Sequence, residues 1–86
     1  MTVASLPNIG PQTERLLAAV GIGSEAELRE VGAVPAYVRL KFRYPERVSL
    51  NALWALQGAL TGRPWTALPE DEKAWLRRAV TEVTGR

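Results

Sequence analysis

Apolar residues recur at intervals of three and four positions along most of this chain, which is the spacing that places them on one face of an α-helix. The first such stripe consists of Leu16, Leu17 and Val20, and it lies between Pro11 and Gly21. Proline suits the first position of a helix because an N–H group would have no intrahelical partner there. The pattern therefore predicts a first helix that begins at Pro11 and is stopped by Gly21.

A second helix is predicted over residues 25–31, with Leu28 facing inward and Gly32 as its stop. Ser24 and Glu27 fit a capping box. In this arrangement the serine oxygen accepts a backbone N–H three residues on, and the glutamate reaches back toward the start of the helix.

Residues 35–44 allow two interpretations. Pro35 can open a helix that ends before Pro45, because the residue that precedes a proline disfavours helical geometry. Residues 38–44, VRLKFRY, also alternate apolar and basic side chains with the period of a half-buried strand. We expect the helix, because no second strand is available and an isolated strand would leave its backbone unpaired. Its inward candidates are Tyr37, Val38 and Leu40, with Phe42 as a further one.

Ser49 caps a fourth predicted helix over residues 50–61, which Gly62 ends. Apolar residues cover much of its circumference, so we expect it to be the central and most buried helix. These residues are Leu50, Leu53, Trp54, Leu56, Ala59 and Leu60. A loop over residues 62–68 leads to Pro69 and a last helix, whose inward stripe is predicted to be Leu76, Ala79, Val80 and Val83. Trp54 and Trp65 are both expected in the core.

The composition agrees with a small folded protein. Hydrophobic residues make up 47% of the 86 positions and charged residues 23%, which is ordinary for a globular domain. Together with the helical patterns this predicts a compact all-α bundle of about five short helices. The chain shows neither a signal peptide nor a long apolar span, so a cytoplasmic protein without a membrane segment is expected.

Several kinds of catalysis are excluded by residue type. The chain has no cysteine and no histidine, which removes thiolate zinc sites, cysteine nucleophiles and the imidazole base. Glu70, Asp71 and Glu72 are adjacent on a helix and point in different directions, so they suit the helix dipole better than one metal ion. Ser24 and Ser49 are caps before they are nucleophiles. We therefore expect no enzyme, no catalytic residue, no metal, no cofactor and no small-molecule substrate.

The net charge of +2 is unevenly distributed. Residues 1–32 carry −2, residues 69–86 balance, and residues 33–68 carry +4 because five basic residues face one glutamate. Arg39 and Arg43 lie four positions apart and so share one face of the predicted third helix. This face is either a solvated surface or part of a nucleic-acid patch.

The turn that precedes the first helix, Leu6-Pro7-Asn8-Ile9-Gly10-Pro11, has a chemistry of its own. Free backbone N–H groups at a helix N-terminus, with the helix dipole behind them, can hold a phosphate without reading a base. The turn resembles the hairpin of helix-hairpin-helix modules, which contact the nucleic-acid backbone in this way. It serves either this purpose or only the start of a helix. The candidate contacts are Asn8, Ile9 and Gly10 through their amides, then Gln12 and Arg15, with Arg39 and Arg43 assisting.

Nearly the whole chain resembles the C-terminal domain of the TfoX/Sxy family of competence regulators. The segments that carry the resemblance are LPNIGP at 6–11, GAV at 32–34, SLNAL at 49–53, ALQGAL at 55–60, Trp65, and Leu68 with Pro69. The resemblance implies one helix-hairpin-helix-type, SAM-like domain over residues 1–86, with the turn and first helices at 6–32 and the remaining helices at 33–86. It also implies a link to DNA uptake or transcription. The family's usual N-terminal domain is missing, which suggests a stand-alone module.

Two functions follow as hypotheses. The first is weak, sequence-independent binding of the DNA backbone by the turn and the arginines in competence or transcription regulation. The second is a protein-interaction adaptor that meets a protein of the transcription machinery or its own copy. Trp75, about 100° around the helix from Leu76, would then lie at the edge of the buried stripe, where it either packs on its own domain or is covered by a partner.

Overall fold

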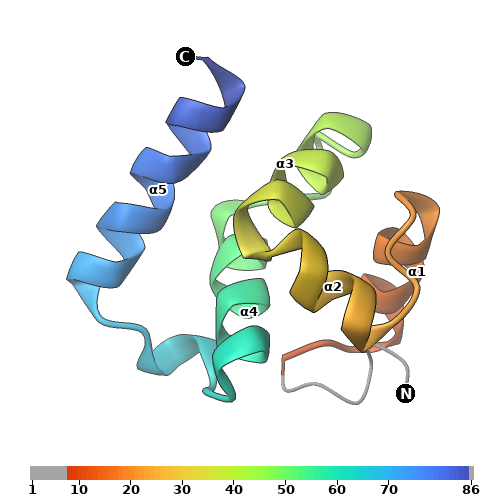
Figure 1. Cartoon of the computed structure of the whole chain (residues 1–86), viewed down its shortest axis with the longest axis horizontal. Coiled ribbons are helices and arrows are strands. Elements are labelled where there is room, and N and C mark those ends of the chain that lie inside the picture. The colour runs from red at the N-terminus through yellow and green to blue at the C-terminus, as the bar shows by residue number, and fades with distance from the viewer. Residues whose placement is uncertain (1–7, 86) are drawn as a thin grey trace.

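The computed structural model describes residues 8–85, which form five α-helices and one short 3₁₀ helix and contain no strand (Figure 1). The elements are α1 (Pro11–Ala19), α2 (Glu25–Val31), α3 (Ala33–Arg43), α4 (Leu50–Thr61), η2 (Trp65–Ala67) and α5 (Glu70–Thr84). The all-α fold is confirmed, and the alternative strand over residues 38–44 is wrong because α3 covers most of that segment. The helix-hairpin-helix detail stays a prediction. Leu6 and Pro7 of the predicted turn lie outside the described residues.

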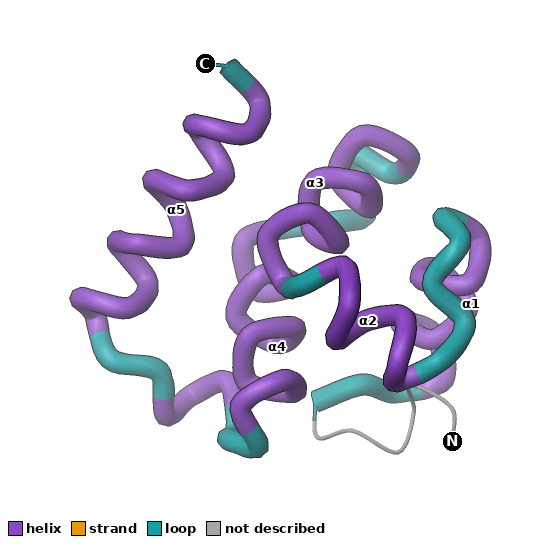
Figure 2. The backbone as a smooth tube through the Cα atoms, viewed as in Figure 1, coloured by secondary structure: helices purple, strands orange, loops and turns teal. Residues whose placement is uncertain are grey.

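The helix α3 organises the bundle, since it packs against α1, α2, α4 and α5. In Figure 1, α1 and α5 lie on opposite sides of the molecule, with α2, α3 and α4 between them. The tube in Figure 2 shows how short loops join the first helices, whereas a longer connection that contains η2 carries the chain from α4 to α5. The outer faces of α1 and α5 are therefore separate surfaces.

The core is apolar and draws on every α-helix. Its largest fully buried side chains are Leu17, Ile22, Leu28, Leu40, Leu53, Leu56 and Leu76. Trp54 is 6% exposed, as expected, and α4 is the most densely buried helix, with five buried residues. No polar or charged residue in the described part of the chain is buried. Fold stability therefore rests mainly on hydrophobic burial.

Four apolar residues that were expected inside are exposed. Trp65 opens η2 in the connection between α4 and α5, and its side chain is 39% exposed. Val83 lies in the last turn of α5 and is 57% exposed, and Figure 1 shows that this end of α5 extends beyond α4. Leu50 is the first residue of α4 and is also exposed. Phe42, near the end of α3, has the largest exposure of the four, at 89%.

The helix ends follow the local signals with two differences. The Ser24 hydroxyl accepts the backbone N–H of Glu27 at 3.1 Å, but the Glu27 carboxylate reaches the N–H of Gly23 instead of that of Ser24. Helix α3 begins at Ala33, two residues before the predicted Pro35. Gly32, with a φ of 90°, forms the N-cap, and Pro35 then falls in the first turn, where no N–H is needed.

Candidate nucleic-acid interface

The side chain of Asn8 fastens the opening turn to α4 and to the connection that follows it. Its Nδ2 donates to the carbonyl oxygen of Arg63 at 2.9 Å and to that of Ala55 at 3.4 Å. Its Oδ1 accepts the backbone N–H of Trp65 at 3.2 Å. Asn8 also has a φ of 69°, a left-handed conformation that asparagine tolerates better than most residues. The Asn8 side chain is therefore engaged within the fold.

Gly58 makes this junction possible. It lies inside α4, and a Cβ atom there would stand 2.6 Å from the Arg63 carbonyl oxygen and 2.6 Å from Asn8 Nδ2. We call Asn8, Gly58, Arg63 and Trp65 the Asn8 junction. Sequence reasoning missed it, although a glycine inside a helix costs about 1 kcal/mol relative to alanine and often marks a close approach of another segment.

The remaining turn residues divide into a buried and an exposed part. Ile9 is 6% exposed and belongs to the core. Gly10 is exposed and forms the N-cap of α1, where no side chain caps the helix. Gln12 is exposed on the first turn of α1. Of the predicted turn contacts, Gly10 and Gln12 therefore lie open to solvent, Ile9 is covered, and Asn8 is half-buried.

Arg15 lies on an exposed face of α1 that leads toward α3. Gln12, Arg15 and Ala19 share this face because they lie three and four positions apart. Ala19 in turn lines a shallow hollow together with Arg39 and Arg43 of α3. Helix α1 is nine residues long, so its two ends are about 13 Å apart. The turn lies at one end of α1, and Arg39 and Arg43 lie near the other.

The two arginines of α3 are tied to the protein only weakly. Arg39 Nη1 donates to the carbonyl oxygen of Val20 at a long 3.5 Å, which places Arg39 at the C-terminal end of α1. The Arg43 guanidinium lies 5.0 Å from the centre of the Tyr44 ring. Within residues 8–85, neither forms an ion pair, and Arg15 forms none either. These charges remain available to an anion.

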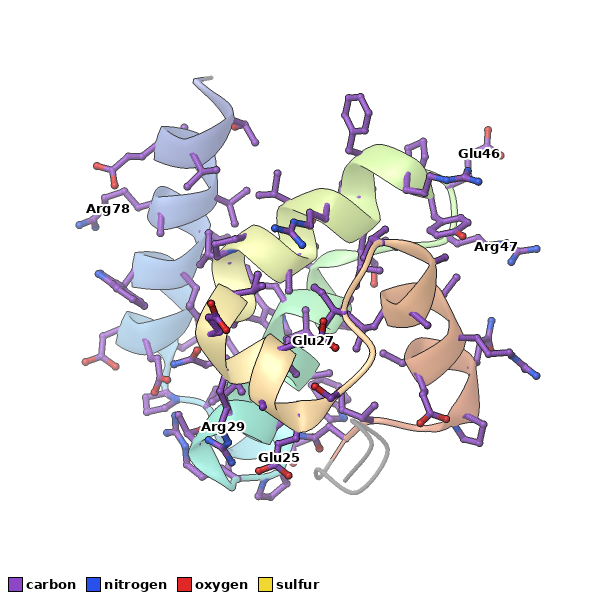
Figure 3. All side chains as sticks on the ribbon, turned by 45° about the vertical axis from the view of Figure 1, so that its right-hand side comes forward. Glu25, Glu27, Arg29, Glu46, Arg47 and Arg78 are labelled. Atoms are coloured by element: carbon purple, nitrogen blue, oxygen red, sulfur yellow. The ribbon has the colours of Figure 1, made fainter. Side chains whose placement is uncertain are left out.

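Lys41 differs from its neighbours because it serves the fold. Its Nζ donates to the carbonyl oxygens of Pro45 at 2.9 Å and Val48 at 2.7 Å, so it holds the chain that follows α3. In that loop Glu46 and Arg47 both point outward in Figure 3. Of the four basic residues between positions 39 and 47, Lys41 stabilises the fold, and the other three, Arg39, Arg43 and Arg47, face solvent. We call Arg15, Arg39 and Arg43 the basic edge.

The acidic residues at the start of α5 each have a separate partner. Glu72 Oε2 accepts from Arg63 Nη2 at 2.6 Å and from Gln57 Nε2 at 2.8 Å. The hydrogen bond from Arg63, followed by that from Gln57, lowers the pKa of the Glu72 carboxyl. Asp71 Oδ1 accepts the backbone N–H of Glu72, and Glu70 lies 3.9 Å from Lys73 Nζ. In the described residues, no three acidic side chains gather as a metal site.

Trp75 lies on α5, across the bundle from α1, and is 56% exposed. This agrees with its expected place at the border of the buried stripe, since its neighbour Leu76 is 1% exposed. The buried indole of α4, Trp54, has Lys73 Nζ at 5.6 Å and the Arg77 guanidinium at 5.9 Å from a ring centre. Trp75 and the basic edge therefore belong to different surfaces.

The fold is therefore that of a small all-helical domain whose surface carries exposed cationic and aromatic side chains. The chain belongs to the TfoX C-terminal domain family, which residues 1–80 match. The family resemblance stated from the sequence is thereby confirmed. No helix within residues 8–85 is both long enough and apolar enough to cross a membrane.

Two relatives match most of this chain. The chain is 38% identical over 78 residues to the DNA transformation protein TfoX of Haemophilus influenzae, an alignment that covers 91% of this chain. It is 32% identical over 75 residues to the DNA transformation protein TfoX1 of Aliivibrio fischeri, which covers 87% of this chain. In both cases the alignment spans 36% of the relative's own length.

Two solved structures share the fold over most of their length. An uncharacterized protein from Listeria monocytogenes, in a triclinic crystal form, superposes with a TM-score of 0.86 at 32% identity, covering 100% of this chain and 97% of the other. A tetragonal form of a Listeria monocytogenes protein of unknown function gives a TM-score of 0.83 at 33% identity, covering 94% and 98%.

Proposed function

We propose that this protein is a non-enzymatic module of competence-linked regulation that holds the nucleic-acid backbone through its basic edge. The observation that carries the proposal is the position of Arg39 and Arg43, exposed and without ion pairs beside the end of α1. Arg15 extends the edge along α1 toward Gly10 and Gln12, whose backbone N–H groups would supply a further phosphate contact. A cytoplasmic location is part of the proposal.

The names of the relatives give the proposal its biological setting. Both are DNA transformation proteins, and the two alignments cover 87% and 91% of this chain. Because the aligned region is only 36% of each relative, it would supply one function of a larger machinery. Contact with nucleic acid is the function that the basic edge fits best.

Three arginines would give weak and strongly salt-dependent binding. Each neutralised phosphate of duplex DNA contributes about −0.9 to the slope of log K against log salt. Three contacts therefore predict a slope of about −2.7, or a loss of roughly 40-fold in affinity between about 50 and 200 mM salt. Because phosphate contacts carry no sequence information, unrelated duplexes should bind alike.

The test is fluorescence anisotropy with a labelled duplex at low and moderate salt. The double variant Arg39→Glu, Arg43→Glu should lower affinity at least about tenfold and reduce the salt slope by about two. The control is Arg78→Glu on α5, an exposed arginine that points away from the body in Figure 3. Absence of binding at low salt, or an equal loss in the control, would contradict the proposal.

A second candidate function rests on Trp75. An indole that is 56% exposed on α5 is a favourable anchor for a protein partner or a second copy. Trp75→Ala should then weaken association while helicity remains unchanged. This candidate function fails if the protein stays monomeric at high concentration and pull-down experiments recover only nucleic acid.

A further inference from the structure

Phe42 is the most exposed large apolar side chain of the described residues. Its side chain is 89% exposed, although the neighbouring Leu40 on the same helix is 1% exposed. An isolated exposed phenylalanine is not in itself unusual. Phe42, however, lies three residues after Arg39 and next to Arg43, the two arginines without ion pairs.

The ring stands on a ridge between two hollows. Phe42 and Val38 contribute to both of them. The hollow toward α1 is further lined by Ala19, Val20, Arg39 and Arg43. The hollow toward α5 is further lined by Tyr37, Lys41, Val80 and Thr84. Apolar side chains therefore line both sides of the exposed ring. The hollow toward α1 also contains Arg39 and Arg43, and the hollow toward α5 contains Lys41.

The charges around the ridge specify an anionic ligand. The segment from α3 to Val48 carries Arg39, Lys41, Arg43 and Arg47 against Glu46 alone. A second copy of the protein would bring the same cations against this surface, which opposes self-association through the ridge. A ligand that combines a flat apolar group with regularly spaced negative charge matches the surface instead, and an unpaired nucleotide has both features.

We propose that the ridge binds single-stranded nucleic acid, with an unpaired base stacked on Phe42 and adjacent phosphates held by Arg39 and Arg43. The inference rests on the proposed function and narrows its ligand. Bases in a duplex are already stacked on each other and do not reach a ring on the protein surface. Phe42 should therefore contribute to single strands and not to duplexes.

The experiment compares three labelled probes by fluorescence anisotropy: a thymidine oligonucleotide of about twelve residues, an abasic strand of the same length, and a duplex. Phe42→Ala should lower affinity for the thymidine strand by about tenfold and leave the abasic strand and the duplex within about twofold. Its salt slope should be unchanged, because no phosphate contact is lost.

Conservative variants separate stacking from general apolar contact. Phe42→Tyr should retain single-strand binding, whereas Phe42→Leu should lose it nearly as fully as Phe42→Ala. Trp75→Ala on α5 is the matched control, because it removes another exposed aromatic side chain, 56% exposed, from a surface that does not include the basic edge. Circular dichroism of each variant checks that the fold is intact.

Several results would overturn the inference. One is an equal loss on all three probes, and another is no change with Phe42→Ala. A third is full retention of single-strand binding by Phe42→Leu. A fourth is a dimer, seen by sedimentation, that Phe42→Ala dissociates, because the ridge would then be a contact between two copies of the protein. If duplex binding depends on Arg39 and Arg43 while Phe42 has no effect, only the inference fails. If single-strand binding depends on Phe42 while duplexes do not bind at all, backbone binding to duplexes fails instead.

Discussion

The Asn8 junction and the surface around Phe42, with Arg39 and Arg43, differ in how far the fold itself engages their central residue. Asn8 has a left-handed backbone, and its side chain makes three hydrogen bonds to α4 and the connection that follows. Phe42 lies within the regular helix α3 but is almost fully exposed, close in sequence to Arg39 and Arg43, which form no ion pair within the described residues. The first arrangement contributes to stability, whereas the second adds little packing and carries the nucleotide contact that we propose.

This difference changes the weight of the predicted contacts. The sequence suggested that Asn8, Ile9 and Gly10 would together present amides to a phosphate. In the structure the Ile9 side chain is part of the core and the Asn8 side chain closes the junction, so only Gly10 of these three is exposed. The arginines of α3, which lie at the far end of α1, are both exposed.

Among changes in the Asn8 junction and at Phe42, the largest expected effect on stability comes from Gly58→Ala. Alanine normally favours the interior of a helix by about 1 kcal/mol. Here its Cβ would stand 2.6 Å from backbone and side-chain atoms of the junction, so we expect a loss of roughly 2–3 kcal/mol in the free energy of unfolding. Urea unfolding measures it. Gly23→Ala is the control, because its Cβ would meet only ordinary contact at 3.5 Å. A stabilised Gly58→Ala protein would contradict the close packing of the junction.

A smaller loss is expected from Asn8→Gly. Glycine adopts the left-handed backbone without strain, so this variant loses the side-chain hydrogen bonds and gains unfolded-state entropy, at a combined cost of about 1–2 kcal/mol. Asn8→Ala should cost more, because alanine adds the strain of a positive φ. Thermal unfolding measures both. The folded Asn8→Gly protein should bind DNA like the wild type, and a selective loss of binding would mean that the Asn8 side chain touches the ligand.

The smallest effect on stability is expected from Phe42→Ala. A side chain that is 89% exposed loses little burial when it is removed, so the free energy of unfolding should change by less than about 0.5 kcal/mol. Leu40→Ala, two residues earlier, should cost about 2–5 kcal/mol because Leu40 is 1% exposed. The same urea series measures both variants. A large loss with Phe42→Ala would show that the ring packs within the fold.

Signals that act between neighbours in the sequence predicted the helices well. The predicted bounds of α2 and α4 agree with the structure, because Ser24, Ser49 and Gly62 act on the helix ends next to them. The start of α3 was misplaced by two residues, since the prediction relied on Pro35 and did not consider that Gly32 could supply an N-cap with positive φ.

Features that depend on distant segments could not be predicted in the same way. The hydrogen bonds of Asn8 join positions 47, 55 and 57 residues apart, and no local pattern indicates them. The exposure of Trp65 and Phe42 depends on whether another helix covers them, which their residue types do not decide. The arginines of the basic edge, by contrast, could be named from charge distribution and helical spacing alone.

An amide NMR titration with a single-stranded oligonucleotide locates the ligand surface residue by residue in the intact protein. It tests most directly whether the basic edge and Phe42 bind nucleic acid. The predicted result is a set of chemical-shift changes centred on Arg39, Phe42 and Arg43, extending along α1 past Arg15 and weakening as salt is raised. Changes confined to the surface around Trp75, or no changes at low salt, would contradict it.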